Sequence, residues 1–137
     1  MRAIKFRAWD KVAKHVLMIF DSEQGKDWFL PMWKDRYEIM QFAGMLDKNG
    51  KDIYEGDILF LINESGTPIR VVCEFGTATH KTLASGLTVA IAGFFFKTQE
   101  GLHTFPIVKN YLGKNDLEIM EVIGNIYENP ELLEAPE

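Results

Sequence analysis

Apolar and polar residues alternate with a period of two along much of the chain, which predicts strands more often than helices. In residues 4–9, with the sequence IKFRAW, Ile4, Phe6 and Ala8 alternate with Lys5, Arg7 and Trp9, as in a half-buried strand. A polar connection at 10–15 precedes the short apolar run 16–20, so we expect a first hairpin here. Residues 38–42 predict a further strand.

The segment 40–62 carries the clearest local signal. The pair Asn49-Gly50 readily supplies the positive φ angles of a tight hairpin turn. The pair Gly56-Asp57 then interrupts the chain before the apolar run ILFLI, which is typical of a strand buried on both faces. We therefore expect these four residues to set the backbone geometry of two turns.

More strands are expected downstream, at 69–75, 87–97, 102–108 and 118–127. Gly93 predicts a bulge or bend suited to curling a sheet. The small-residue segment 76–86 is expected to be a mobile loop, and Asn129 before Pro130 predicts the N-cap of one short terminal turn. The predicted fold is mainly β, a β-rich α+β arrangement with a small curled, barrel-like sheet and a few helical turns.

The chain length of 137 residues suits a single domain. Within it, we expect 1–45 to hold the N-terminal strands and an irregular or helical aromatic excursion, and 46–137 to hold the barrel-like portion. Apolar residues at 47% and charged residues at 26% are those of an ordinary globular protein. No apolar run reaches the roughly 20 residues needed to cross a bilayer, and the N-terminus lacks the apolar region of a signal peptide.

The single cysteine, Cys73, excludes an intrachain disulfide and a multi-cysteine metal site. Together with the absent leader, it favours the cytoplasm. Its apolar and acidic neighbours would raise its thiol pKa, so we expect a packing residue and not a nucleophile. The net charge of −5 argues against a sequence-independent duplex binder.

Three blocks resemble the YopX family of phage and prophage proteins. They are KFRAWD at 5–10, MQFAGMLDKNGKDIYEGDIL at 40–59 and EVIGNIYENPELL at 121–133. The resemblance implies a protein made in a bacterial host cell by a phage or prophage, with a mostly β fold that has an SH3-like barrel portion. It implies no reaction, cofactor or catalytic residue. The pair Met45-Leu46 departs from the Leu-Lys-type pair of relatives.

An acidic cluster in the middle block raises the possibility of a metal-dependent hydrolase. Its members are Asp47, Asp52, Glu55 and Asp57. A calcium loop beginning at Asp47 fails, because Ile58 stands at the twelfth position, where a glutamate is required. The turn-forming interpretation is therefore favoured and no metal is predicted, although carboxylates converging in space would revive the hydrolase hypothesis.

A nucleic-acid-binding accessory role is the main alternative. Basic residues share one face of the first strand, and aromatic side chains offer a stacking platform for unpaired bases. The residues for such a nucleic-acid or partner contact are Arg2, Lys5, Arg7, Trp9, Trp28, Trp33 and Tyr37. The competing interpretation, which the negative charge favours, makes the aromatic residues core and the basic residues a protected strand edge.

The leading hypothesis is a non-enzymatic protein-interaction module that binds a host or phage protein, or itself, and no membrane. The sequence contains no Gly-x-Ser-x-Gly elbow and no phosphate-binding glycine signature, so no catalytic residue and no cofactor are predicted. A small β-rich domain offers strand edges and aromatic-lined grooves to extended partners.

Overall fold

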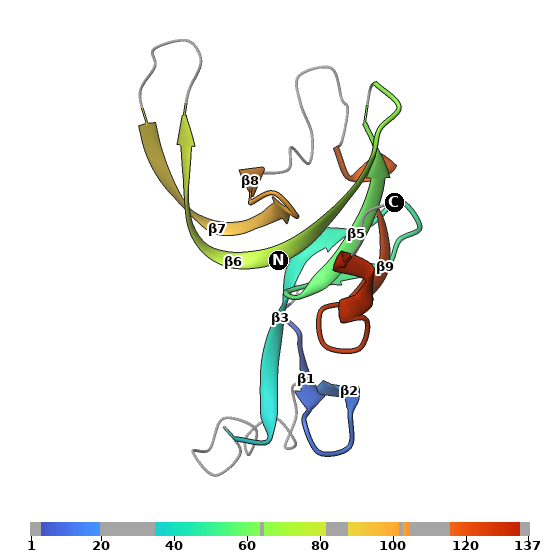
Figure 1. The fold of residues 1–137 in the computed structure, drawn as a ribbon. Helices are drawn as coiled ribbons and strands as arrows, with labels where there is room; N and C mark the ends of the chain where they lie inside the picture. Colours follow the sequence, from blue (N-terminus) through green and yellow to red (C-terminus); the bar gives the residue numbers. More distant parts are fainter. Residues whose placement is uncertain are drawn as a thin grey trace.

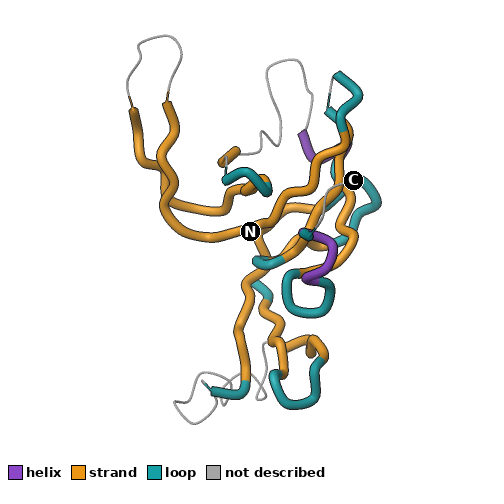
Figure 2. The backbone as a smooth tube through the Cα atoms, viewed as in Figure 1, coloured by secondary structure: helices purple, strands orange, loops and turns teal. Residues whose placement is uncertain are grey.

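The computed structural model describes residues 4–19, 35–63, 65–81, 88–101, 103–104 and 116–134. In these ranges the regular structure is almost entirely β, with two short 3-10 turns (Figures 1 and 2). The predicted β-rich fold is thus confirmed. No helix among the described residues is long and apolar enough to cross a membrane.

The first sheet has the strand order β2-β1-β3-β4, with antiparallel neighbours. Its strands are β1 (Phe6–Asp10), β2 (His15–Ile19), β3 (Tyr37–Leu46) and β4 (Asp52–Tyr54). The predicted first hairpin is confirmed by the direct pairing of β1 with β2. We call this the N-terminal sheet.

Asp10 organises the turn of the first hairpin. Its buried Oδ1 accepts the backbone N–H groups of Val12 and Ala13 at 2.9 and 3.0 Å. Arg36, just before β3, donates to both carboxylate oxygens, at 3.1 and 3.0 Å. These bonds, that of Arg36 above all, lower the pKa of Asp10 from 3.8 to about 2.

The second sheet has the order β8-β7-β6-β5-β9 and curls strongly into a half-barrel (Figure 1). Its strands are β5 (Asp57–Ile62), β6 (Pro68–Lys81), β7 (Thr88–Thr98), β8 (His103–Thr104) and β9 (Glu121–Asn125). The 3-10 turn η2 (Asp116–Ile119) leads into β9. The expected likeness to an SH3 barrel and the expected division near residue 45 stay predictions.

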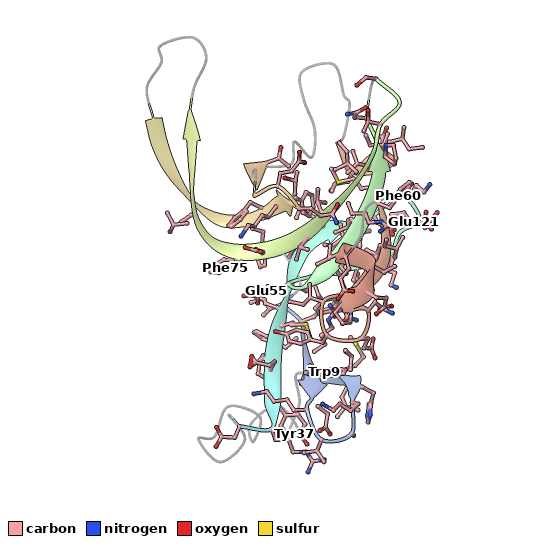
Figure 3. All side chains as sticks on the ribbon, viewed as in Figure 1. Trp9, Tyr37, Glu55, Phe60, Phe75 and Glu121 are labelled. Atoms are coloured by element: carbon pink, nitrogen blue, oxygen red, sulfur yellow. The ribbon has the colours of Figure 1, made fainter. Side chains whose placement is uncertain are left out.

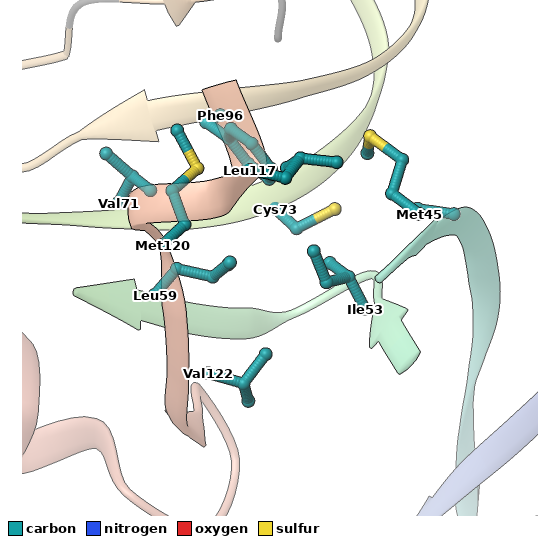
Figure 4. Packing of buried hydrophobic residues seen from close by; sticks show 10 residues of the cluster. Met45, Ile53, Leu59, Val71, Cys73, Phe96, Leu117, Met120 and Val122 are labelled. Carbon is teal, nitrogen blue, oxygen red and sulfur yellow. The ribbon is translucent and has the colours of Figure 1, made fainter. Parts of the chain in front are cut away.

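The hydrophobic core lies between the end of β3, β4, the half-barrel sheet and η2 (Figure 4). Cys73 is fully buried in this core, and this burial is the largest of the effects that raise the pKa of its thiol. Burying a large apolar side chain stabilises a fold by about 1.5–3 kcal/mol, so burial of this cluster is a main source of the stability of the fold. Its members are Ala43, Met45, Ile53, Leu59, Val71, Cys73, Phe96, Leu117, Met120 and Val122.

The expected loop at 76–86 is wrong for the part that the structure describes. Residues 76–81 continue β6 and pair with β7, from Gly76 opposite Gly93 to Lys81 opposite Thr88. Small residues without proline are compatible with a paired ribbon, and glycine there permits the bend. Gly93, predicted to mark a bend, has a φ of +145°.

The predicted terminal turn exists as η3 (Pro130–Leu133), with Asn129 at its N-cap position. The Asn129 side chain makes no capping hydrogen bond, which corrects that part of the prediction. Its Oδ1 instead accepts the backbone N–H of Asn125 at 3.2 Å. Arg70 Nη1 of β6 donates to the carbonyl of Leu132 at 2.7 Å and holds the turn against the sheet.

Candidate functional site

A buried ion pair connects the two sheets. Arg7 Nη2 donates to Asp57 Oδ1 at 2.6 Å, and the two side chains expose only 9% and 1% of their surface. The other Asp57 oxygen accepts the Tyr54 N–H at 2.8 Å, and the guanidinium lies 4.7 Å from the centre of the Tyr54 ring. Burial raises the pKa of Asp57, and Arg7 opposes that rise. Removing either partner would leave an uncompensated charge in the interior.

Gly56 shapes the turn that carries this pair. Its φ is +84°, and its N–H donates to the carbonyl of Cys73 at 2.8 Å. Its own carbonyl accepts the N–H of Ile126 at 2.8 Å. A Cβ here would lie 3.3 Å from the sulfur of Met40. The predicted turn position therefore joins β4 and β5 to both β6 and the C-terminal segment.

The C-terminal segment packs against the first hairpin beside the ion pair. The Trp9 and Tyr127 rings stack with their centres 5.7 Å apart and an interplanar angle of 19°. Glu128 Oε2 accepts the N–H of Val16 in β2 at 3.2 Å, and Oε1 accepts Asn125 Nδ2 at 2.9 Å. We call the region formed by these contacts and the Arg7–Asp57 pair the junction; Figure 3 shows Trp9 among its strands.

Asparagine side chains fix the backbone of this C-terminal segment. Asn125 Oδ1 accepts the N–H groups of Tyr127 and Glu128 at 3.0 and 2.8 Å. A Cβ added to Gly124 would lie 2.5 Å from Asn129 Oδ1, so the segment closes tightly only with glycine there.

Asp47 connects the Asn49-Gly50 turn to β9. Its Oδ1 accepts the N–H groups of Asn49 and Lys51 at 2.8 and 2.9 Å, and its Oδ2 accepts that of Val122 at 2.9 Å. Burial opposes ionisation, but these three donors hold the pKa of Asp47 below its usual value. Gly50 has a φ of +81°, the conformation expected from the sequence.

An open polar pocket of about 320 Å³ lies beside the ion pair. Arg7, Lys51, Asp57 and Glu128 are its charged lining residues. Asp57 and Glu128 already accept hydrogen bonds from the protein, and these bonds hold the strands together. Arg7 Nε and the Tyr54 hydroxyl are buried without a partner among the described residues. The junction thus keeps some unused hydrogen-bonding capacity while its acids serve structural contacts.

The four acids of the hydrolase hypothesis do not converge. Asp47 binds backbone N–H groups, Asp52 pairs with Lys5 at 2.9 Å, Glu55 accepts the N–H of Gln41 at 3.0 Å, and Asp57 pairs with Arg7. Within the described ranges, no group of three or more candidate metal ligands is close enough to hold an ion. The convergence on which that hypothesis depends is therefore not found in this part of the chain.

The residues predicted for nucleic-acid contact differ in their exposure to solvent. Arg7 and Trp9 are buried, because Arg7 pairs with Asp57 and Trp9 stacks on Tyr127. Lys5 is exposed and Tyr37 is half-buried. The contact stays a prediction, which in the described residues would depend on Lys5 and Tyr37. The remaining candidates, Arg2, Trp28 and Trp33, lie outside the described residues.

The three sequence blocks that carry the family resemblance meet at the junction. The first supplies Arg7 and Trp9, the second Asp57, and the third Asn125 and Tyr127. Sequence reasoning missed this convergence, although the blocks themselves were the signal for it. The junction is thus the common structural element of the chain's most characteristic segments.

A second region differs from the junction because only two strands form it among the described residues. We define the distal hairpin as residues 75–81 of β6 and 88–94 of β7. β5 pairs with β6 only as far as Val72, and β8 pairs with β7 only at Phe96 and Lys97. Among the described strands, the distal hairpin therefore has two members only, and Figure 1 shows it curving away from the other elements.

An aromatic pair lies at the base of the distal hairpin. Phe75, labelled in Figure 3, is 57% exposed and contacts Phe94 edge-to-face, with ring centres 4.8 Å apart. Phe94 also packs against the core cluster. Beyond this pair, Thr77 lies opposite Ala92, and both are exposed. The aromatic pair thus extends the apolar surface of the core into solvent at the base of the hairpin.

Comparison with known proteins agrees with the resemblance seen in the sequence. The model of the YopX protein family matches residues 18–134. The crystal structure of protein EF1440 from Enterococcus faecalis is similar, with 27% sequence identity and a TM-score of 0.58 over 98% of this chain and 100% of that chain. No curated protein matches significantly. The chain belongs to the YopX protein family.

Proposed function

We propose that this chain is a non-enzymatic protein-interaction module of a phage or prophage. It acts in the cytoplasm of the bacterial host and binds a host or phage protein, or another copy of itself. The exposed Phe75 at the base of the two-stranded distal hairpin carries this proposal. Large aromatic side chains contribute strongly to protein interfaces.

The architecture also suits binding of an extended segment. A two-stranded ribbon is at best marginally stable in water. Among the described strands, neither strand of the distal hairpin has a second neighbour, and strand addition to such an edge satisfies backbone groups while side chains select the partner. A partner that covered Phe75 and paired with one edge would stabilise this part of the fold.

Affinity capture with matched variants tests the proposal. The tagged chain is incubated with host lysate, from infected and uninfected cells, and self-association is measured in parallel. Phe75→Asp should abolish stoichiometric binding, because it places a charge in the apolar contact. Ile62→Asp is the control, since Ile62 is similarly exposed, at 54%, at the end of β5. Absence of any partner and of self-association, or equal loss with both variants, would overturn the proposal.

A further inference from the structure

The polar pocket at the junction contains hydrogen-bond donors that the described part of the protein does not use. Its volume of about 320 Å³ lies within the range of ~300–1,000 Å³ that is typical of small-ligand sites. The polar residues of its lining come from all three blocks that carry the family resemblance. They are Arg7, Lys51, Asp57, Asn125, Glu128 and Asn129. The segments that build the junction therefore also build this pocket.

The acceptors of the pocket are already engaged. Both carboxylate oxygens of Asp57 accept hydrogen bonds from the protein, and so do both oxygens of Glu128. The side-chain oxygen of Asn129 accepts the N–H of Asn125 at 3.2 Å. A ligand that offered donors would therefore compete with bonds that hold the strands together.

The unused polar groups are donors, and they belong to Arg7, Lys51 and Asn129. Arg7 Nε is buried without a partner, and an unsatisfied donor in the interior is costly. The Lys51 side chain is exposed and takes part in no ion pair among the described residues. Asn129 Nδ2 donates to no described residue, since only its oxygen is bound. The complementary ligand is therefore an acceptor.

The charges around the pocket favour a ligand with a single negative charge. The two cations of the lining, Arg7 and Lys51, balance its two carboxylates. Burial raises the pKa of Asp57, and the positive charges of Arg7 and Lys51 oppose that rise, so both cations act at this end of the pocket. Glu128 is exposed, and water and salt screen its charge. A monoanion thus meets two cations and one buried carboxylate, whereas a dianion would be repelled more strongly.

We propose that the junction pocket binds a carboxylate group, which accepts hydrogen bonds from Arg7 Nε and from the Lys51 ammonium group. Carboxylate oxygens form strong charge-assisted bonds with such donors. The carboxylate belongs to a small free acid or to the C-terminus of a peptide, two sources of the same chemistry. The site lies at the junction, whereas Phe75 lies at the base of the distal hairpin. It is therefore a second binding function beside the proposed partner contact.

Nuclear magnetic resonance of the isotope-labelled full chain tests this site, with N-acetylglycine as the probe. The matched probe is N-acetylglycinamide, which has nearly the same shape but no charge. At constant ionic strength, N-acetylglycine should shift the Arg7 Nε–H resonance in a saturable manner, and the amide should leave it in place. Acetate distinguishes the two sources. Tighter binding of N-acetylglycine than of acetate assigns a peptide C-terminus, and the reverse order assigns a small free acid.

Two lysines near the Asn49-Gly50 turn provide matched variants. Lys51→Met removes the free cation of the pocket, so the affinity for N-acetylglycine should fall at least about tenfold. Lys48→Met is the control, because Lys48 pairs with Glu121 at 3.6 Å and is not part of the pocket lining. This control should retain the affinity of the unaltered chain.

Several results would overturn the carboxylate site. They are no saturable shift with either acid, equal shifts with N-acetylglycinamide or chloride, and equal weakening by Lys51→Met and Lys48→Met. Tighter binding of inorganic phosphate than of both acids would refute the choice of a monoanion. Phe75→Asp should leave the titration unchanged, so failure of this site and failure of the proposed partner contact are distinguishable.

Discussion

The junction and the distal hairpin represent opposite ways of ending a β-sheet. At the junction, side chains from β1, β5, β9 and the C-terminal segment satisfy one another, as in the Arg7–Asp57 pair and the Trp9–Tyr127 stack. In the distal hairpin, two strands extend beyond the core and leave Phe75 largely exposed. The difference teaches that charged and aromatic side chains fix the junction, whereas the distal hairpin is the surface that we propose for a partner.

The largest effect should follow from breaking the ion pair at the junction. Arg7→Met keeps most of the side-chain volume but leaves Asp57 buried without its cation, so we expect a loss of roughly 3–5 kcal/mol in the free energy of unfolding. Urea unfolding followed by tryptophan fluorescence measures it.

Lys5→Met is the control for that experiment. Lys5 pairs with Asp52 on the same face, but both side chains are partly exposed, at 43% and 31%. Exposed pairs contribute little, so the unfolding midpoint should hardly change. Equal destabilisation by the two variants would show that the buried Arg7–Asp57 pair stabilises the fold no more than the exposed Lys5–Asp52 pair.

Two glycines give the next contrast. Gly124→Ala forces Asn129 away from the N–H of Asn125, because the new Cβ would lie 2.5 Å from its Oδ1. We expect a loss of about 1–3 kcal/mol in unfolding free energy. Gly76→Ala in the distal hairpin meets nothing within 4 Å and should be neutral or slightly stabilising. A larger loss of unfolding free energy with Gly76→Ala than with Gly124→Ala would contradict the packing described for the C-terminal segment.

The smallest effect concerns acid stability. The pKa of Asp10 is lowered from 3.8 to about 2, chiefly by Arg36, so its contribution is complete above the unfolded value and is lost as the pH falls toward 2. Asp10→Asn should therefore flatten the decline of the urea midpoint between about pH 4 and 2. Glu100→Gln, at an exposed position after β7, controls for net charge. An unchanged slope for Asp10→Asn would refute the assignment.

Local signals predicted much of the fold. The first hairpin and the Asn49-Gly50 turn follow from alternation and turn chemistry within a few residues. The extension of β6 beyond Phe75 was missed because Gly76, Ala78 and Lys81 have weak strand preference, although Thr77 and Thr79 favour strands. Pairing with β7 stabilises the strand conformation that the local sequence alone does not.

The junction could not be predicted from alternation. Period two correctly places Lys5, Arg7 and Trp9 on one face, but it cannot show that another part of the chain covers that face. Asp57 is 50 positions away from Arg7, and their contact exists only in the folded chain. The resemblance of the three blocks to one family marks them as characteristic segments but did not predict that they meet.

The contact between Val16 and Glu128 has a consequence for how the protein is made. It joins residues 112 positions apart, close to the two ends of the chain. Contacts of such sequence separation slow folding, because a large loop must close before they form. The first hairpin therefore waits for this contact until residue 128 has left the ribosome. Nascent chains that stop before residue 127 should stay sensitive to protease in their N-terminal strands, and chains in which residue 128 has left the ribosome should lose that sensitivity.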